Sequence, residues 1–157
     1  MSQHNLEARL HYLESCEAIR SLIGQYATAA DQRNNPQILQ HLFHDDAVWT
    51  ASGFGEYQGR QNILDALSSI AEEQILWSLH IMAMPDIQII DEFNATSSWM
   101  LWEVCHYAQA TAEKNQPASM SCLGGFYHSI IRREEDEIWK FERVELNLTF
   151  NQPFPTV

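Results

Sequence analysis

Apolar residues recur at helical spacing along the first part of the chain. From Leu6 to Ala30 they return every three or four positions, with charged residues between them. This period places the apolar side chains on one face of a helix. The polar segment 32–35 breaks the period, so the pattern predicts a long helix that ends near Asp31. Pro36 suits the first turn of a second, short helix, which we expect to run through Leu42 and Phe43.

Most of the remaining chain has the pattern of β-strands. A short strand is expected at 47–50, after a turn at Asp45 and Asp46, and a further helix at 61–73. Four runs rich in aromatic and β-branched residues follow, at 75–90 (interrupted at Pro85), 95–110, 120–133 and 138–150. Helices followed by long strands predict an α+β domain, in which helices cover one face of a curved, mainly antiparallel sheet. Such a sheet forms a cone with an open mouth, where a ligand can bind.

Length and charge narrow the function classes. The 157 residues, of which 45% are hydrophobic, fit one compact domain over 1–157. Nine Lys and Arg residues stand against 21 Asp and Glu, and the net charge of -12 would repel a phosphate backbone. This argues against nucleic acid and anionic membranes as partners. No apolar segment approaches the ~20 residues that span a bilayer, and no secretory signal begins the sequence, so we expect a cytoplasmic protein.

Three histidines interrupt apolar, strand-like runs. His80 alternates with Met82 and Met84, and His106 and His128 stand in similar rows of the next two strands. A histidine in such a row is most often a core residue held by a hydrogen bond. Three of them in successive strands make a shared site a competing interpretation.

Asp31 also has two interpretations. At a helix end, an aspartate is usually a solvated cap or turn former. If Asp31 instead faces the cone, its carboxylate needs a donor, because an unpaired buried charge is costly. A histidine N–H is a suitable donor, and the resulting pair leaves the other ring nitrogen as a general base near neutral pH.

A metal or a phosphate-bearing cofactor is not predicted. His41 and His44 stand three residues apart, but no third ligand follows at a defining spacing, and we interpret them as surface polar residues. The pair Gly53 and Gly55 lacks the strand-to-helix context of a dinucleotide-binding loop. We therefore expect no cofactor.

Several of these features together resemble the SnoaL-like branch of the nuclear transport factor 2-like superfamily. They are the order of the elements, Tyr26 and Asp31 at the end of the first helix, and the segments 45–50, 55–60 and 138–141. The chain is most similar to the group of scytalone dehydratase, bile acid 7α-dehydratase and hexachlorocyclohexane dehydrochlorinase. The resemblance implies a cystatin-like fold, a cone-shaped α+β barrel.

The resemblance also implies roles for individual residues. In the eliminating members an aspartate at the end of the first helix pairs with the histidine that removes the substrate proton, and these positions fall on Asp31 and His80. A second catalytic histidine falls on His106, a tyrosine on Tyr26, and a polar substrate-binding position near His128. Candidates for the apolar wall of the binding site are Trp49, Phe54, Met82, Met84, Trp102 and Phe126.

These residues predict a cofactor-independent lyase, of the dehydratase or dehydrohalogenase type, or an isomerase. Its substrate would be a small hydrophobic, cyclic molecule. The alternatives are a non-catalytic domain of the same fold that binds small molecules or serves assembly, and a partner protein like the β-subunit of a dioxygenase. The aromatic sheet predicts a homodimer in each case, and a trimer is compatible with the family.

Overall fold

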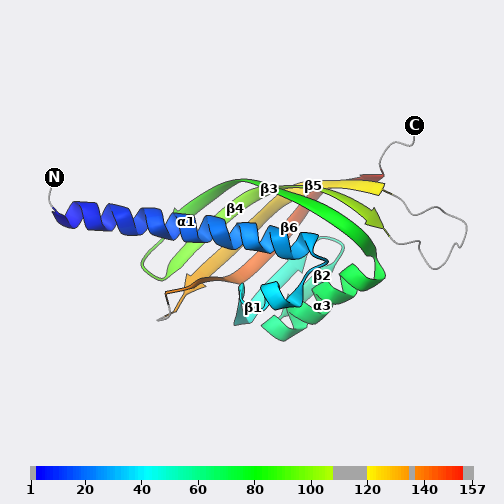
Figure 1. Ribbon diagram of the computed structural model, residues 1–157, viewed down its shortest axis with the longest axis horizontal. Coiled ribbons are helices and arrows are strands. Elements are labelled where there is room, and N and C mark those ends of the chain that lie inside the picture. Colours follow the sequence, from blue (N-terminus) through cyan, green and yellow to red (C-terminus); the bar gives the residue numbers. More distant parts are fainter. Residues whose placement is uncertain (1–2, 108–119, 135–136, 154–157) are drawn as a thin grey trace, which may run out of the picture.

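A long helix lies along a curved six-stranded sheet, and the N-terminal part of this helix projects beyond the sheet (Figure 1). The computed structural model describes residues 3–107, 120–134 and 137–153. Its elements are α1 (Gln3–Asp31), α2 (Pro36–Leu39), β1 (Phe43–Ala51), β2 (Gly55–Gln58), α3 (Arg60–Glu73), β3 (Ile75–Ile89), β4 (Asn94–Tyr107), β5 (Met120–Arg133) and β6 (Trp139–Pro153). None of the helices in the described ranges has the length and apolar character that a membrane crossing requires.

The sheet has the strand order β2-β1-β6-β5-β4-β3. All neighbouring strands are antiparallel except β1 and β6, which pair in parallel. The α+β class and the mainly antiparallel sheet are therefore as the sequence predicts. In the part of the chain that the structure describes, the sheet stays open, with β2 and β3 at its edges.

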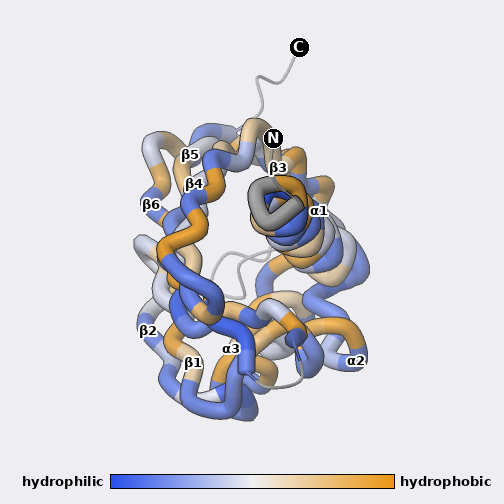
Figure 2. Tube along the Cα trace, turned by 90° about the vertical axis from the view of Figure 1, so that its left-hand side faces the viewer, coloured by the Kyte–Doolittle hydropathy of each residue, from blue (hydrophilic) through white to orange (hydrophobic). Residues whose placement is uncertain are grey.

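The core lies between the concave face of the sheet and the helices α1 and α3, which the sheet wraps around in Figure 2. Its centre is a cluster of aromatic rings. Phe141 is fully buried, and its ring centroid lies 5.6 Å from those of Tyr26 and Phe43 and 6.1 Å from that of Trp99. The cluster joins α1 to β1, β4 and β6, so it fixes the helix against the sheet.

The first strand differs from the sequence prediction. Helix α2 ends at Leu39, and Phe43 already belongs to β1, which also contains Asp45 and Asp46. The Phe141 N–H donates to the Leu42 carbonyl over 2.7 Å, so pairing with β6 overrides the local helical pattern. Residues 44–47 form an irregularity in the β1–β6 pairing, since the register shifts between Phe43 and Val48. The last part of the strand expected at 95–110 lies outside the described residues.

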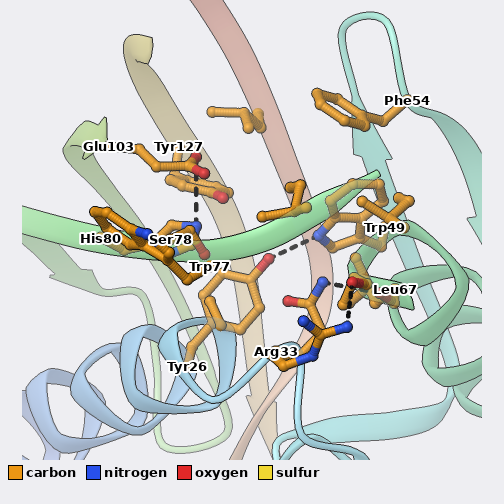
Figure 3. A pocket seen from close by; sticks show the side chains of 16 residues that line it. Tyr26, Arg33, Trp49, Phe54, Leu67, Trp77, Ser78, His80, Glu103 and Tyr127 are labelled. Carbon is orange, nitrogen blue, oxygen red and sulfur yellow. Dashed lines mark hydrogen bonds and ion pairs between the residues drawn. The ribbon is translucent and has the colours of Figure 1, made fainter. Parts of the chain in front are cut away.

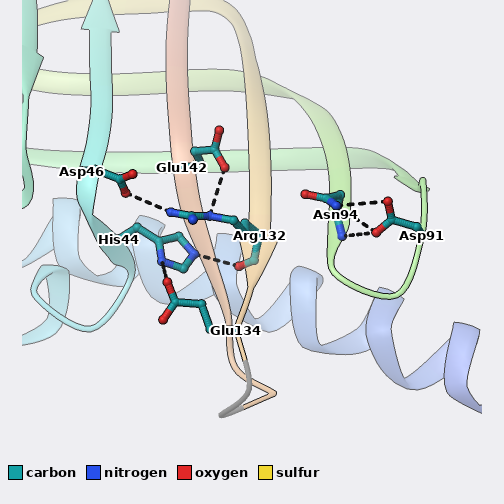
Figure 4. Close-up of polar contacts among 7 residues, drawn as sticks. All are labelled: His44, Asp46, Asp91, Asn94, Arg132, Glu134 and Glu142. Atoms are coloured by element: carbon teal, nitrogen blue, oxygen red, sulfur yellow. Dashed lines mark hydrogen bonds and ion pairs between the residues drawn. The ribbon is translucent and has the colours of Figure 1, made fainter.

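His44 is buried rather than on the surface. Its Nε2 donates to the carbonyl oxygen of Arg132 over 3.0 Å, and its Nδ1 lies 3.4 Å from Glu134 Oε1. The Arg132 side chain in turn forms ion pairs with Asp46 and Glu142 (Figure 4). The histidine that we interpreted as a surface residue therefore links β1 to the end of β5.

Candidate active site

The end of α1 is held in place by a turn with two left-handed residues. Arg33 and Asn34 have φ values of 62° and 51°, and their N–H groups donate back to the Ala30 carbonyl. The Arg33 side chain donates to the carbonyls of Ala71 and Leu76, on either side of the junction between α3 and β3. Two non-glycine residues in this conformation cost free energy, so the surrounding contacts must hold them. They fix the direction of Asp31 relative to β3.

Asp31 binds His80 twice. Its Oδ1 accepts the backbone N–H of His80 over 2.7 Å and the ring Nδ1–H over 2.9 Å. Because a carboxylate only accepts, this contact fixes the proton on Nδ1 and leaves Nε2 directed away from Asp31. The contact between aspartate and histidine that the resemblance implies is present in the structure.

A second carboxyl group meets the other side of the His80 ring. Glu103 Oε2 lies 3.4 Å from His80 Nε2, and the two residues are direct partners across β3 and β4. The His80 side chain is 11% exposed and that of Glu103 is 8% exposed. The imidazole therefore stands between two carboxyl groups. Figure 3 shows its contact with Glu103.

The environment of Glu103 raises the pKa of its carboxyl group. Burial raises the pKa of the Glu103 carboxyl above its ordinary value. The neighbouring His80 lowers this pKa, and the negative charge of Asp31 raises it. The net effect is upward, so Glu103 binds a proton more readily than a solvated glutamate does.

Tyr26 supplies a hydroxyl group to the same site. Its oxygen accepts a hydrogen bond from Trp49 Nε1 over 2.8 Å. Burial raises the pKa of Tyr26 to about 12, although hydrogen bonds from Trp49 and Tyr127 act in the opposite direction. Burial also raises the pKa of Tyr127 well above its ordinary value. Both phenols therefore keep their protons at neutral pH and act as hydrogen-bond donors rather than bases.

These side chains line a pocket with one polar and one apolar side. His80, Glu103 and Tyr26 form the polar side, while α3 contributes Leu67 and Ile70 to the apolar side (Figure 3). The cavity volume is about 60 Å³. The interior is therefore narrow, and it suits a small or flat molecule.

The structure brings several of the predicted site residues together. Tyr26, Trp49, Phe54 and His80 line the pocket, and Asp31 contacts His80. Met82 is partly buried against the core and does not line the pocket.

The structure places the other candidates elsewhere. In β4 the buried row contains Leu101, Glu103 and Cys105, so His106 and Trp102 lie on the opposite, outer face. Phe126 and His128 are likewise exposed on the outer face of β5. None of these four lines the pocket, and the sequence-based choice of the inward face was wrong for these two strands.

Met84 also lies away from the pocket. It has a φ of 55° and stands where the β3–β4 register shifts between Ala83 and Asp86. This irregularity ends the alternation that would have kept Met84 on the same side as His80. Its side chain is exposed, with a relative accessibility of 78%.

Glu103 and Tyr127 are among the pocket residues that were not predicted from the sequence. Glu103 is the only charged residue in a row that otherwise contains Trp99, Leu101 and Cys105, and that isolation is a usable signal. Tyr127 gives no comparable signal, because a tyrosine among apolar residues is an ordinary core residue. In the ranges that the structure describes, no three His, Cys, Asp or Glu side chains are arranged to hold a metal ion.

Comparisons with known proteins identify relatives of this fold. The model of the SnoaL-like domain family matches residues 11–145. Among curated proteins, none matches the sequence. The remaining relatives are solved structures.

Three of these structures illustrate the range of similar proteins. A hexachlorocyclohexane dehydrochlorinase from Novosphingobium barchaimii is 18% identical, with a TM-score of 0.83 over 95% of this chain and 96% of that chain. A scytalone dehydratase-like protein from Novosphingobium aromaticivorans is 21% identical, with a TM-score of 0.77 over 94% and 92%. A nuclear transport factor 2-like superfamily protein from Salmonella enterica is 14% identical, with a TM-score of 0.71 over 90% and 92%. At these identities the likeness establishes the fold, which is the one that the sequence predicts.

Proposed function

Because this chain belongs to the SnoaL-like domain family, we propose that it is a cofactor-independent lyase or isomerase with His80 as its general base. The observation that carries the proposal is the contact between Asp31 and His80, whose ring lines a pocket with both polar and apolar walls. Two proteins of similar structure are named for elimination reactions, one of chloride and one of water. Their names support an elimination.

Each polar residue has a role in this proposal. His80 Nε2 removes a proton from carbon, and Asp31 keeps the ring in the required tautomer and stabilises its protonated form. An imidazole is a weak base, so we expect a substrate whose carbon is acidified by a neighbouring electron-withdrawing group, such as a carbonyl. The Tyr26 hydroxyl faces the pocket as a donor and would stabilise the negative charge that develops on the carbonyl oxygen.

The pocket walls define the class of substrate. Trp49 and Phe54 provide aromatic surface, and α3 provides aliphatic surface. The narrow interior favours a flat, hydrophobic molecule such as a cyclic ketone.

Exchange of carbon-bound hydrogen tests the proposal without knowledge of the natural substrate. We expect the protein to accelerate incorporation of deuterium next to the carbonyl of cyclohexanone or 2-tetralone in D₂O, measured by proton NMR. This reaction requires only a base and stabilisation of the enolate. Exchange of both ketones at the rate of buffer alone would contradict the proposal and leave the non-catalytic binding domain in its place.

We further propose that the outer face of the sheet is the interface of a homodimer. This outer apolar patch consists of Leu79, Ile81, Met100, Trp102 and Phe126, which are all exposed. Direct partners across the strands make it continuous, since Ile81 faces Trp102 and Met100 faces Phe126. A large continuous apolar patch is rare on monomers, and a patch on a sheet face can pack on its own copy about a twofold axis.

The mass in solution tests this interface. We expect light scattering to give twice the chain mass of 18.1 kDa for the wild type and a single chain mass for Trp102→Glu, which places like charges across the axis. Ile90→Glu changes an equally apolar, exposed residue outside the patch and should remain dimeric. A wild-type monomer would contradict the interface, and three chain masses would replace the dimer with a trimer.

A further inference from the structure

The contact between Glu103 and His80 indicates which leaving group the proposed elimination expels. This inference rests on the proposed function. Both side chains project from the same face of the sheet into the pocket, because they are direct partners on neighbouring strands. Their nearest polar atoms, Glu103 Oε2 and His80 Nε2, are 3.4 Å apart. The group that would remove a proton therefore lies next to a group that can supply one.

We propose that Glu103 is the general acid of the site, and that its carboxyl group protonates the hydroxyl group that leaves the substrate.

The pattern of donors supports a proton on Glu103. His80 Nδ1 donates its proton to Asp31, so in the neutral ring Nε2 carries a lone pair. An ionised Glu103 would set a second acceptor against that lone pair, whereas a protonated Glu103 would donate to it. The same total number of protons also allows a charged ring between two carboxylates. In either arrangement Glu103 and His80 share one proton.

The surroundings of Glu103 also raise the pKa of its carboxyl group. Burial and the charge of Asp31 raise the pKa of Glu103, and His80 opposes them. The other titratable groups that interact with Glu103 are Tyr26, Tyr127, Cys105 and Tyr107, and burial raises the pKa of each of them. They remain neutral and give no cationic partner that would favour ionised Glu103.

The proposed reaction is balanced within the site. His80 Nε2 takes the proton from the carbon next to the carbonyl, and the electrons of that C–H bond form the new C=C bond. The C–O bond at the β-carbon breaks, its electrons stay on oxygen, and the Glu103 proton completes a water molecule. The proton on His80 Nε2 then passes to the Glu103 carboxylate, which restores the starting state.

The chemical class of the leaving group can be inferred from the position of an acid beside the base. Hydroxide is a poor leaving group and departs only if it is protonated, so an acid is required. Halide and carboxylate ions leave without a proton, and a site for them gains nothing from an acid beside the base. A protonated carboxyl group next to the base therefore selects a hydroxyl leaving group over a halide.

Two substrates that differ only in the leaving group test this inference. Elimination from 3-hydroxycyclohexanone requires an acid, elimination from 3-acetoxycyclohexanone does not, and both give cyclohexenone, which is followed by its ultraviolet absorbance. In Glu103→Gln we expect the ratio of kcat/KM for the hydroxy over the acetoxy compound to fall by about 10²- to 10⁴-fold. Because both reactions use His80, the ratio cancels any effect of the variant on the base.

The controls separate the possible failures. Glu145→Gln makes the same chemical change on the outer face of β6 and should leave the ratio unchanged. Thermal unfolding should show that Glu103→Gln is folded, and its deuterium exchange of cyclohexanone reports how far the variant affects His80 itself. An unchanged ratio with exchange intact would overturn the role of Glu103 alone. No exchange by the wild type would instead remove the proposed function.

Discussion

Replacement of His80 by alanine is expected to lower the rate of deuterium exchange by about 10²- to 10⁴-fold, the usual contribution of a general base. His80 is the only imidazole among the residues that line the described pocket. In the proposed mechanism Glu103 supplies a proton rather than removing one, and Tyr26 keeps its proton at neutral pH, so neither residue replaces His80 as the base. The exchange rate is measured by NMR with the same ketones at equal protein concentration.

Asp31→Asn should produce a loss of the same order while His80 remains in place. The asparagine can present its amide N–H₂ to His80 Nδ1, which would favour the wrong tautomer of the ring. His128→Ala is the matched control, because it removes an imidazole from the exposed outer face. If His80→Ala and Asp31→Asn exchange as fast as His128→Ala, the Asp-His base is not the mechanism.

The largest loss of stability is expected for Phe141→Ala, about 3–5 kcal/mol in the free energy of unfolding. The Phe141 ring is fully buried and contacts the rings of Tyr26, Phe43 and Trp99. Its removal leaves a cavity at the point where α1, β1 and β4 meet, and the surrounding rings cannot collapse fully into it. Chemical denaturation followed by tryptophan fluorescence measures the loss.

Phe93→Ala provides the comparison, because the same atoms are removed from a side chain that is 47% exposed. We expect it to cost less than half as much as Phe141→Ala, since less contact area and no enclosed cavity are involved. Equal losses for the two variants would show that the aromatic cluster is not the centre of the core. Tyr26 belongs to this cluster, so Phe141→Ala should also reduce deuterium exchange in the protein that remains folded.

The helices and long strands were predictable because their patterns of apolar residues are regular and continue over many residues. The apolar repeat before Asp31 extends over many turns, and the runs of aromatic and β-branched residues are longer than any loop between them. The start of β1 was not predictable in the same way. Phe43 joins a strand because β6, about a hundred residues later, pairs with it, and no local pattern contains that partner.

The inward face of β4 was the principal error at the site. Alternation normally identifies the buried face by its contrast with a polar one. In β4 the outer face carries Met100 and Trp102, and the inner face carries Glu103, so hydrophobicity does not separate the two faces. If the outer apolar patch binds a second copy, both faces are buried in the assembly and the loss of contrast has a physical cause.

The contact between Asp31 and His80 depended on the family resemblance. The two residues are 49 positions apart, and no spacing rule for a single chain connects a helix end to the middle of a strand. Glu103 was within reach of sequence reasoning, because one charged residue in a buried row needs a partner. His80 on the neighbouring strand is that partner.

Trp102 and Glu103 are consecutive residues of β4 that face opposite sides of the sheet. A shift of the strand by one residue would exchange them, moving the carboxyl group to the outer patch and the indole into the pocket. A substitution in the central part of β4 therefore alters either the pocket or the outer face and leaves the other face unchanged. The strand cannot accept an insertion or deletion of a single residue, because one such event would disrupt the pocket and the outer face together.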